Sequence, residues 1–134
     1  MDSWHFQYNI DADVEHSIVY EKIYGVWQVD TARSYAEDFK EEAKEIIKKP
    51  WVKMIDLMNW KTASPEVIDV VGQHLRWCAE HNMVLSVNIL NNTVTYGYLQ
   101  RMFARGATKD ISKTFRSRHE AVQFLKQQGY RVRS

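Results

Sequence analysis

The feature of this sequence that most constrains its fold is a repeated change of hydrophobic period along the chain. Residues 4–10 alternate between apolar or aromatic and polar side chains, and residues 18–24 do the same. A period of two is typical of half-buried β-strands. Over residues 33–49 the apolar side chains recur instead at every third or fourth position, as in an amphipathic helix. The chain is therefore expected to combine strands and helices in one alternating order.

The same alternation continues to the C-terminus. The run at residues 83–90 is almost continuously apolar, which is typical of a strand covered on both faces in a parallel sheet. Helices between successive strands produce parallel, right-handed connections. The sequence therefore predicts an α/β fold of order β-β-α-β-α-β-α-β-α, with a mostly parallel five-stranded sheet and an N-terminal antiparallel hairpin. The later strands are predicted at residues 51–57, 83–90 and 109–115, and the later helices at residues 64–81, 96–105 and 117–129.

Individual residues mark the expected ends of the helices. Thr31 or Ser34 is predicted to cap the first helix, and Pro50 to stop it. Ser64, followed by proline and an acidic residue, has the pattern of an N-cap for the second helix. Residues 58–63 are expected to form the loop before that cap.

Length, composition and charge limit the function classes. The chain has 134 residues, 45% of them apolar and 26% charged, which predicts one globular domain over residues 1–134. A net charge of +1 lacks the basic excess typical of nucleic-acid-binding proteins, so no nucleic-acid partner is expected. Cys78 is the only cysteine, which excludes an intramolecular disulfide and fits a reducing compartment. Without a secretory signal or an apolar stretch of roughly 20 residues, we expect a cytoplasmic protein with no stable membrane insertion.

Candidate catalytic and metal-binding side chains are few. His74, Cys78 and His81 share one face of the second predicted helix, but no Cys-x-x-Cys or His-Glu-x-x-His pattern accompanies them. Cys78 also lies on the apolar stripe of that helix, where a free cysteine behaves as a small hydrophobic residue. We therefore expect no metal, no cofactor and no catalytic activity. The alternative is an enzyme with an unrecognised site around Asp56, His74 and Cys78.

Two regions are candidates for binding. Asp56 ends a central strand, where ligands of open α/β sheets bind, so it holds a polar ligand group or bonds to the following loop through Asn59 or Thr62. The second region is the predicted helix at residues 96–105, whose aromatic and Met side chains form a flap over an apolar crevice or simply cover the sheet. On the same helix, Arg101 and Arg105 are positioned to meet an anionic group.

Five short segments spread along the chain form a recognisable pattern: Gly25-Val26-Trp27, residues 51–56, residues 62–66, Trp77-Cys78 and residues 117–121. In these segments the chain resembles the STAS domains, the anti-sigma-factor antagonist-like family, and more narrowly the SpoIIAA-like proteins of bacteria. The order of elements agrees over nearly the whole chain. This resemblance implies a regulatory or binding module.

The resemblance also implies a candidate phosphoacceptor. Phosphorylated members carry a Ser or Thr at the start of the second helix, preceded by an Asp-Ser-Ser-Gly type of loop. Ser64 stands near that place, but the loop here reads Thr62-Ala63, without the Asp-Ser pair and the glycine. Ser64 is thus interpreted either as a phosphoacceptor or as a helix cap alone.

These observations predict a non-catalytic binding or regulatory module. It is expected to bind a partner protein or a nonpolar small ligand in a crevice at the C-terminal ends of the strands. A third hypothesis is a homodimer formed through the aromatic surface of the first hairpin. The predicted ligand or partner surface comprises Asp56, Trp60, Ser64, Tyr96, Leu99, Met102 and Phe103.

Overall fold

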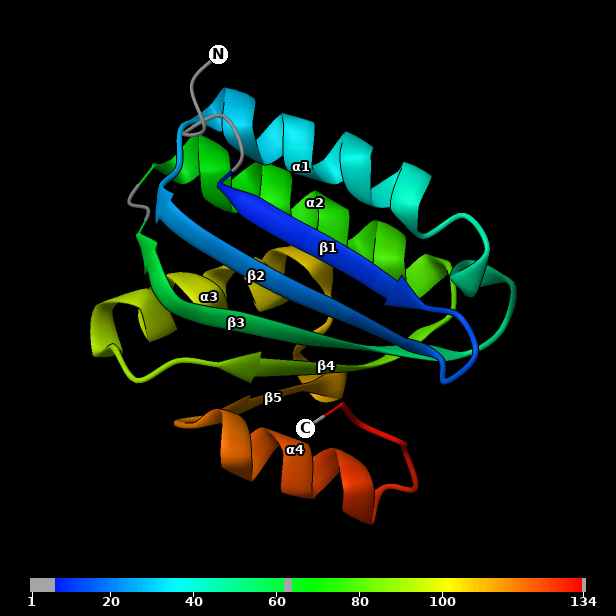
Figure 1. Cartoon of the computed structure of the whole chain (residues 1–134). Helices are drawn as coiled ribbons and strands as arrows, with labels where there is room; N and C mark the ends of the chain where they lie inside the picture. Colours follow the sequence, from blue (N-terminus) through cyan, green and yellow to red (C-terminus); the bar gives the residue numbers. More distant parts are fainter. Residues whose placement is uncertain (1–6, 62–63, 134) are drawn as a thin grey trace.

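A five-stranded sheet forms the centre of the protein, as the computed structural model of residues 7–61 and 64–133 shows (Figure 1). The strands lie side by side in chain order, with β1 antiparallel to β2 and the other pairs parallel. The predicted α/β order and hairpin are confirmed. The strands are β1 (Tyr8–Asp13), β2 (Ile18–Val26), β3 (Trp51–Lys61), β4 (Met83–Ile89) and β5 (Ser112–Phe115).

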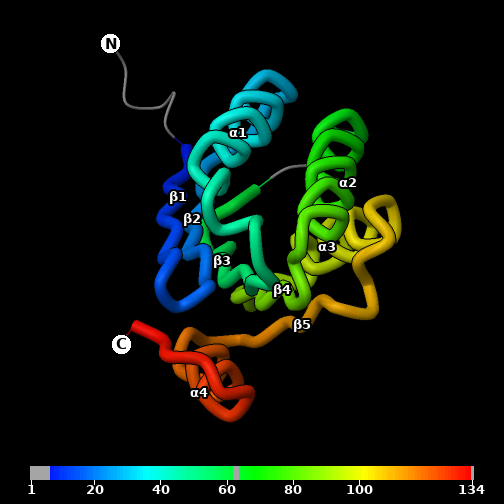
Figure 2. The backbone as a smooth tube through the Cα atoms, turned by 90° about the vertical axis from the view of Figure 1, so that its right-hand side faces the viewer, coloured from blue at the N-terminus to red at the C-terminus, as the bar shows by residue number. Residues whose placement is uncertain are grey.

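The helices divide unequally between the two faces of the sheet (Figure 2). Three of them pack on one face and build the larger core, into which Phe39 and Trp51 are fully buried. The fourth covers the other face, where Leu125 packs against Met54 and Val87. The helices are α1 (Val29–Glu42), α2 (Pro65–Glu80), α3 (Thr93–Gly106) and α4 (Arg118–Gln127), with short 3-10 turns η2 (Ile46–Lys48) and η3 (Lys109–Ile111).

Strand lengths differ from the sequence prediction at several ends. β3 continues to Lys61 through the predicted loop, because β2 pairs with it as far as Val26. β1 extends to Asp13, whereas residues 4–6 of the predicted first strand lie outside the described residues. β5 begins only at Ser112, after the η3 turn.

The predicted start and end of α1 were both wrong, since the helix ends at Glu42 and not at Pro50, with the separate η2 turn between them. Gln28 occupies the N-cap, and both Thr31 and Ser34 lie inside the helix. The physical reason is that the end of β2 is fixed in place, since the Trp27 N–H donates to the Lys61 carbonyl at 3.1 Å and the chain turns directly into the helix. α3 also begins earlier than predicted, because the Asn92 side chain accepts hydrogen bonds from the N–H groups of residues 94 and 95.

Two glycines allow α2 and α3 to approach closely. A Cβ added to Gly106 would lie 2.5 Å from the Gly72 carbonyl oxygen, and one added to Gly72 would lie 2.6 Å from the Cβ of Arg105. An ion pair between Arg105 and Asp69, at 2.5 Å, joins the same two helices. This contact holds α3 against α2 and so sets the position of α3 relative to the edge of the sheet.

Candidate functional site

A groove of about 560 Å³ lies between α3 and β5, where the chain leaves the carboxyl ends of β4 and β5. Crevices at this end of parallel strands are the usual ligand sites of open α/β sheets. Its wall on the α3 side includes Tyr96, Gln100 and Phe103, and β5 forms the opposite wall. The lining residues are Leu90, Asn91, Asn92, Thr93, Tyr96, Gln100, Phe103, Lys109, Ser112, Lys113, Thr114, Phe115 and Arg116.

Local structure fixes both walls of the groove. The Leu90 N–H donates to the Phe115 carbonyl at 3.0 Å, which closes β4 onto β5 at the groove. Asn92 caps α3, and the first helical turn places Tyr96 at the rim with 46% of its surface exposed. Phe103 is buried beneath it and supplies part of the apolar floor. The groove is thus built from an apolar floor and a polar rim.

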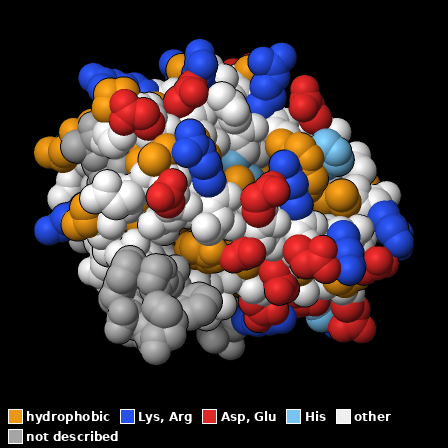
Figure 3. Space-filling view, turned by 90° about the horizontal axis from the view of Figure 1, so that it is seen from above, with side chains coloured by type: hydrophobic (Ala, Val, Ile, Leu, Met, Phe, Trp, Pro, Cys, Tyr) orange, Lys and Arg blue, Asp and Glu red, His pale blue; other side chains and the backbone are white. Residues whose placement is uncertain are grey.

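Among the described residues, the charged side chains that line the groove are all basic. Lys109, Lys113 and Arg116 line it, and no acidic side chain is among the described residues that do so. None of these three cations forms an ion pair within residues 7–61 and 64–133. On the face that carries α1, by contrast, basic and acidic side chains are interspersed (Figure 3).

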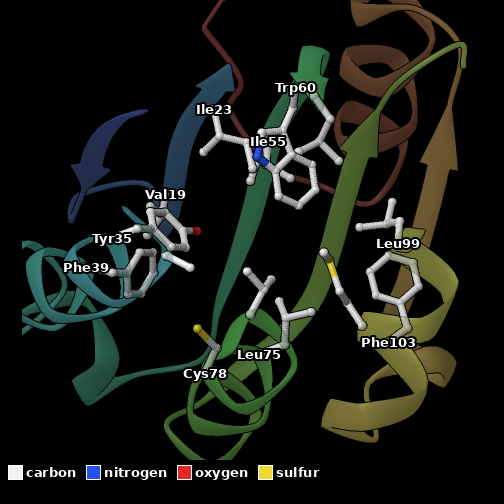
Figure 4. Packing of buried hydrophobic residues seen from close by; sticks show 14 of the residues in the cluster. Val19, Ile23, Tyr35, Phe39, Ile55, Trp60, Leu75, Cys78, Leu99 and Phe103 are labelled. Carbon is white, nitrogen blue, oxygen red and sulfur yellow. The ribbon is translucent and has the colours of Figure 1, made fainter. Parts of the chain in front are cut away.

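The residues predicted for a ligand or partner surface do not form one continuous surface. Tyr96 and Phe103 line the groove. Trp60, Leu99 and Met102 are buried around an internal cavity of about 20 Å³, which has room for about one water molecule. Figure 4 shows Trp60 and Leu99 packed among core side chains of the sheet and of α2. The interior beneath α3 is therefore filled by the protein itself.

The two predicted polar positions make local hydrogen bonds. The Asp56 carboxylate accepts from the Met58 N–H at 2.9 Å, a bond within β3 in place of the one predicted to Asn59; the other predicted partner, Thr62, lies outside the described residues. Ser64 is the N-cap of α2, as predicted, and accepts from the N–H groups of Glu66 and Val67. Its hydroxyl donates to the Glu66 carboxylate at 2.7 Å, a negative charge that would oppose an added phosphate. Phosphorylation of Ser64 stays a prediction.

The arginines predicted to meet an anionic group lie outside the groove. Arg105 pairs with Asp69, and the Arg101 guanidinium lies 5.9 Å from the ring centre of Tyr98. The cations that do line the groove come from η3, β5 and the residue after β5. Sequence reasoning missed them because nothing in a local pattern places β5 beside α3.

The three residues of the alternative enzyme hypothesis do not converge. His74 and Cys78 are in contact, with 3.5 Å between Nε2 and Sγ, and both are buried in the larger core. Asp56 alternates with Ile55 and Leu57 of that core, so its side chain lies on the opposite face of the sheet. Burial raises the pKa of the Cys78 thiol to about 12, far from that of a reactive thiolate. Metal ligation gains no support, since no group of three His, Cys, Asp or Glu side chains suited to a metal ion occurs in the described part of the chain.

A buried polar cluster surrounds His74, and sequence reasoning missed most of it. The Lys53 ammonium lies 3.1 Å from the Glu21 carboxylate and 3.1 Å from His74 Nε2, with less than 2% of either charged side chain exposed. The Tyr35 hydroxyl donates to Glu21 and accepts from Lys53. A sequence signal did exist, since Glu21 stands two residues from both Val19 and Ile23 and so shares their inward-facing side of the strand.

The cluster gives a testable dependence of stability on pH. Burial, with the positive charge of Lys53 nearby, holds the pKa of His74 well below its usual value. The unfolded chain therefore binds a proton near pH 6.5 while the folded protein does not, so the free energy of unfolding decreases as pH falls. Between pH 7 and pH 5 we expect His74 to account for a loss of about 2 kcal/mol.

Urea unfolding of the wild type and of His74→Gln at both pH values measures this loss. The variant should be about 2 kcal/mol less sensitive to acid. Burial raises the pKa of Glu21, which acts in the opposite sense, but Glu21 is present in both proteins and largely cancels in the difference. Equal pH sensitivity of the two proteins would show that His74 does not remain neutral in the folded core.

Comparison with known proteins supports the fold. The structure matches the crystal structure of an uncharacterized DUF3478-family protein with a SpoIIAA-like fold from Shewanella loihica PV-4, with a TM-score of 0.61 and 16% identity. The match covers 88% of this chain and 91% of the other. This chain shares the SpoIIAA-like fold. No family model and no curated protein sequence matches it.

The likeness shows the common fold alone, because the sequences differ at most positions. It agrees with the predicted resemblance to SpoIIAA-like proteins at the level of architecture. Within the part of the chain that the structure describes, no helix has the length and apolar character needed to cross a bilayer. Because the likeness identifies no ligand or partner, any proposal for one has to rest on the residues that line the groove.

Proposed function

We propose that this domain is a non-catalytic binding module and that its site is the groove between α3 and β5. The ligand combines an anionic group with an apolar part. One observation carries the proposal: Lys109, Lys113 and Arg116 line the same groove as Phe103, and within the described residues none of the three forms an ion pair. A purely nonpolar ligand would leave these cations without a partner.

A second groove of similar size gives a useful contrast. It has a volume of about 570 Å³ and lies between α1 and α2. Its basic side chains already have acidic neighbours on their own helices: Lys40 lies 3.4 Å from Glu37, and Arg76 lies 3.6 Å from Glu80. An incoming anion would compete with these carboxylates there, whereas it meets no such competitor among the described residues that line the α3–β5 groove.

Both parts of the ligand have a physical role. Exposed ion pairs contribute only about 0.2–1 kcal/mol each, so three cations alone give weak binding. Apolar area buried on the floor contributes about 25 cal/mol per Å². The cations then select among apolar ligands and orient the bound molecule, as polar groups do in most ligand sites.

The probe for this proposal is 1-anilinonaphthalene-8-sulfonate, which joins an aromatic body to a sulfonate and fluoresces when bound to apolar surface. We expect saturable binding to the wild type. The double variant Lys113→Ala/Arg116→Ala should raise the Kd about tenfold, equivalent to about 1.4 kcal/mol. Fluorescence titration at low ionic strength measures the change.

The matched control removes two exposed cations outside the groove, with Lys126→Ala in α4 and Arg131→Ala after it. This variant has the same net charge as the groove variant and should keep the wild-type Kd within about twofold. An equal loss in both variants would mean that net charge alone governs binding. Unchanged binding in both would place the anion outside the groove and contradict the proposal.

A further inference from the structure

We propose that the natural occupant of the α3–β5 groove is an acidic protein segment in an extended conformation, which adds to the sheet beside β5. This inference rests on the function proposed above, and it names the partner. It combines three observations: an open strand edge, a groove that follows this edge, and uncompensated positive charge along it.

The outer edge of β5 is open for pairing. β5 is the last strand of the sheet and pairs with β4 alone among the described strands. The Lys113 carbonyl accepts from the Asn88 side-chain amide at 3.2 Å, and the Phe115 carbonyl accepts from Leu90, so both residues direct their backbone groups toward β4. Because alternate residues of a strand direct these groups to opposite sides, those of Thr114 face the outer edge.

The groove follows this edge. Five consecutive residues, 112–116, line it, and at about 3.3 Å per residue they span about 13 Å. An extended segment of four or five residues matches that length. Main-chain hydrogen bonds to β5 would supply affinity, and the α3 wall with Tyr96 would contact alternate side chains of the added strand.

Charge decides which segment fits. Lys113 precedes Thr114 in β5 and Arg116 follows the end of the strand, so acidic side chains on the added strand find cations near them along this edge. A second copy of this chain is disfavoured as the occupant, because pairing β5 with β5 would bring the same cations together. Lysine on an edge strand generally opposes pairing with another strand, because its charge would be buried without a partner. An acidic strand supplies that partner.

The test uses a fluorescein-labelled peptide of three Glu-Val repeats and the full-length protein. We expect saturable binding by fluorescence polarisation and none for the matching Lys-Val peptide. The Thr114 amide proton should shift in NMR spectra and exchange more slowly when the Glu-Val peptide is bound. A Glu-Val peptide that is N-methylated at every second residue, on the N–H groups that would face β5, keeps its charge but cannot donate main-chain hydrogen bonds to β5. Its Kd should be at least tenfold higher.

The variant Thr114→Pro examines the same bond from the protein side. Since the Thr114 N–H faces away from β4, proline removes an edge donor and leaves the ladder with β4 in place. We expect at least a tenfold higher Kd for the Glu-Val peptide, and an unchanged Kd would contradict pairing with this edge of β5. The N-methylated peptide gives the same information should the variant fail to fold.

The outcomes separate this inference from the proposed function. Equal affinity for the N-methylated and unmodified peptides, or no peptide binding alongside normal probe binding, overturns strand addition and leaves the anion-binding groove intact. Loss of specific probe binding as well overturns both proposals. Equal binding of the Lys-Val peptide would show that charge does not select the segment.

Discussion

Replacing Lys53 with methionine is expected to lower the free energy of unfolding by about 3–5 kcal/mol at neutral pH. The reason is that Glu21 is fully buried and has Lys53 as its cation at 3.1 Å. Methionine fills similar space but leaves the carboxylate with only the Tyr35 hydroxyl as a hydrogen-bond donor. The uncompensated charge must then be protonated or the core must open.

Urea unfolding at pH 7 measures the effect. The double variant Glu21→Gln/Lys53→Met removes both charges and should recover most of the lost stability, because a buried pair replaced as a unit costs little. Lys126→Met, at an exposed position of α4, is the matched control and should change stability by less than about 0.5 kcal/mol. A Lys53→Met protein as stable as the wild type would contradict the buried ion pair.

Gly106→Ala is expected to reduce the free energy of unfolding by about 2–3 kcal/mol. The added methyl group would meet the Gly72 carbonyl at 2.5 Å, and that atom belongs to helix backbone that cannot turn aside. α3 would have to move away from α2, which also displaces the wall of the groove. We therefore expect weaker binding of the naphthalene sulfonate probe by the variant.

A second glycine of α3 supplies the control. A Cβ added to Gly97 meets nothing within 4 Å, so Gly97→Ala gains helix propensity without a clash. This variant should be more stable than the wild type by about 0.5–1 kcal/mol. Thermal unfolding of the two variants should therefore move in opposite directions. A Gly106→Ala protein that is also stabilised would show that α2 and α3 do not pack this closely.

The order of elements could be predicted from the sequence because the hydrophobic period differs between strand and helix. The strand at residues 83–90 and the helix that begins after Ser64 appear where the pattern places them. The ends of elements were less predictable, since they depend on contacts between distant segments. β3 extends to Lys61 only because β2 runs beside it, a pairing that no local pattern contains.

The candidate site was predictable in its apolar half only. Tyr96 and Phe103 lie on a helix with a clear apolar face, and both line the groove. Nothing in the local sequence distinguishes Lys113 and Arg116 from other exposed polar residues. They can be assigned to the groove only when the tertiary structure is known, because the crossover connection sets β5 beside the beginning of α3.

The buried ion pair was missed for a different reason. Lys and Glu are almost always exposed in folded proteins, so their chemical type gives no reason to place Lys53 and Glu21 in the core. Yet each lies on the core-facing side of its strand. Lys53, for example, stands two residues from both Trp51 and Ile55, which belong to the larger core. The alternation of a strand was therefore the better guide to burial than the chemical type of the side chain.

The strand order also bears on how the protein is made. Every strand after the first pairs with the strand that precedes it in the chain, so the sheet can grow in one direction as residues leave the ribosome. β5 and α4 arrive last. Until then β4 is the open edge, and Val52, Met54 and Val87 lack the cover that α4 gives them. A nascent chain that pauses after α3 would therefore expose both an unpaired edge and an apolar face, which is the stage at which it most needs a chaperone.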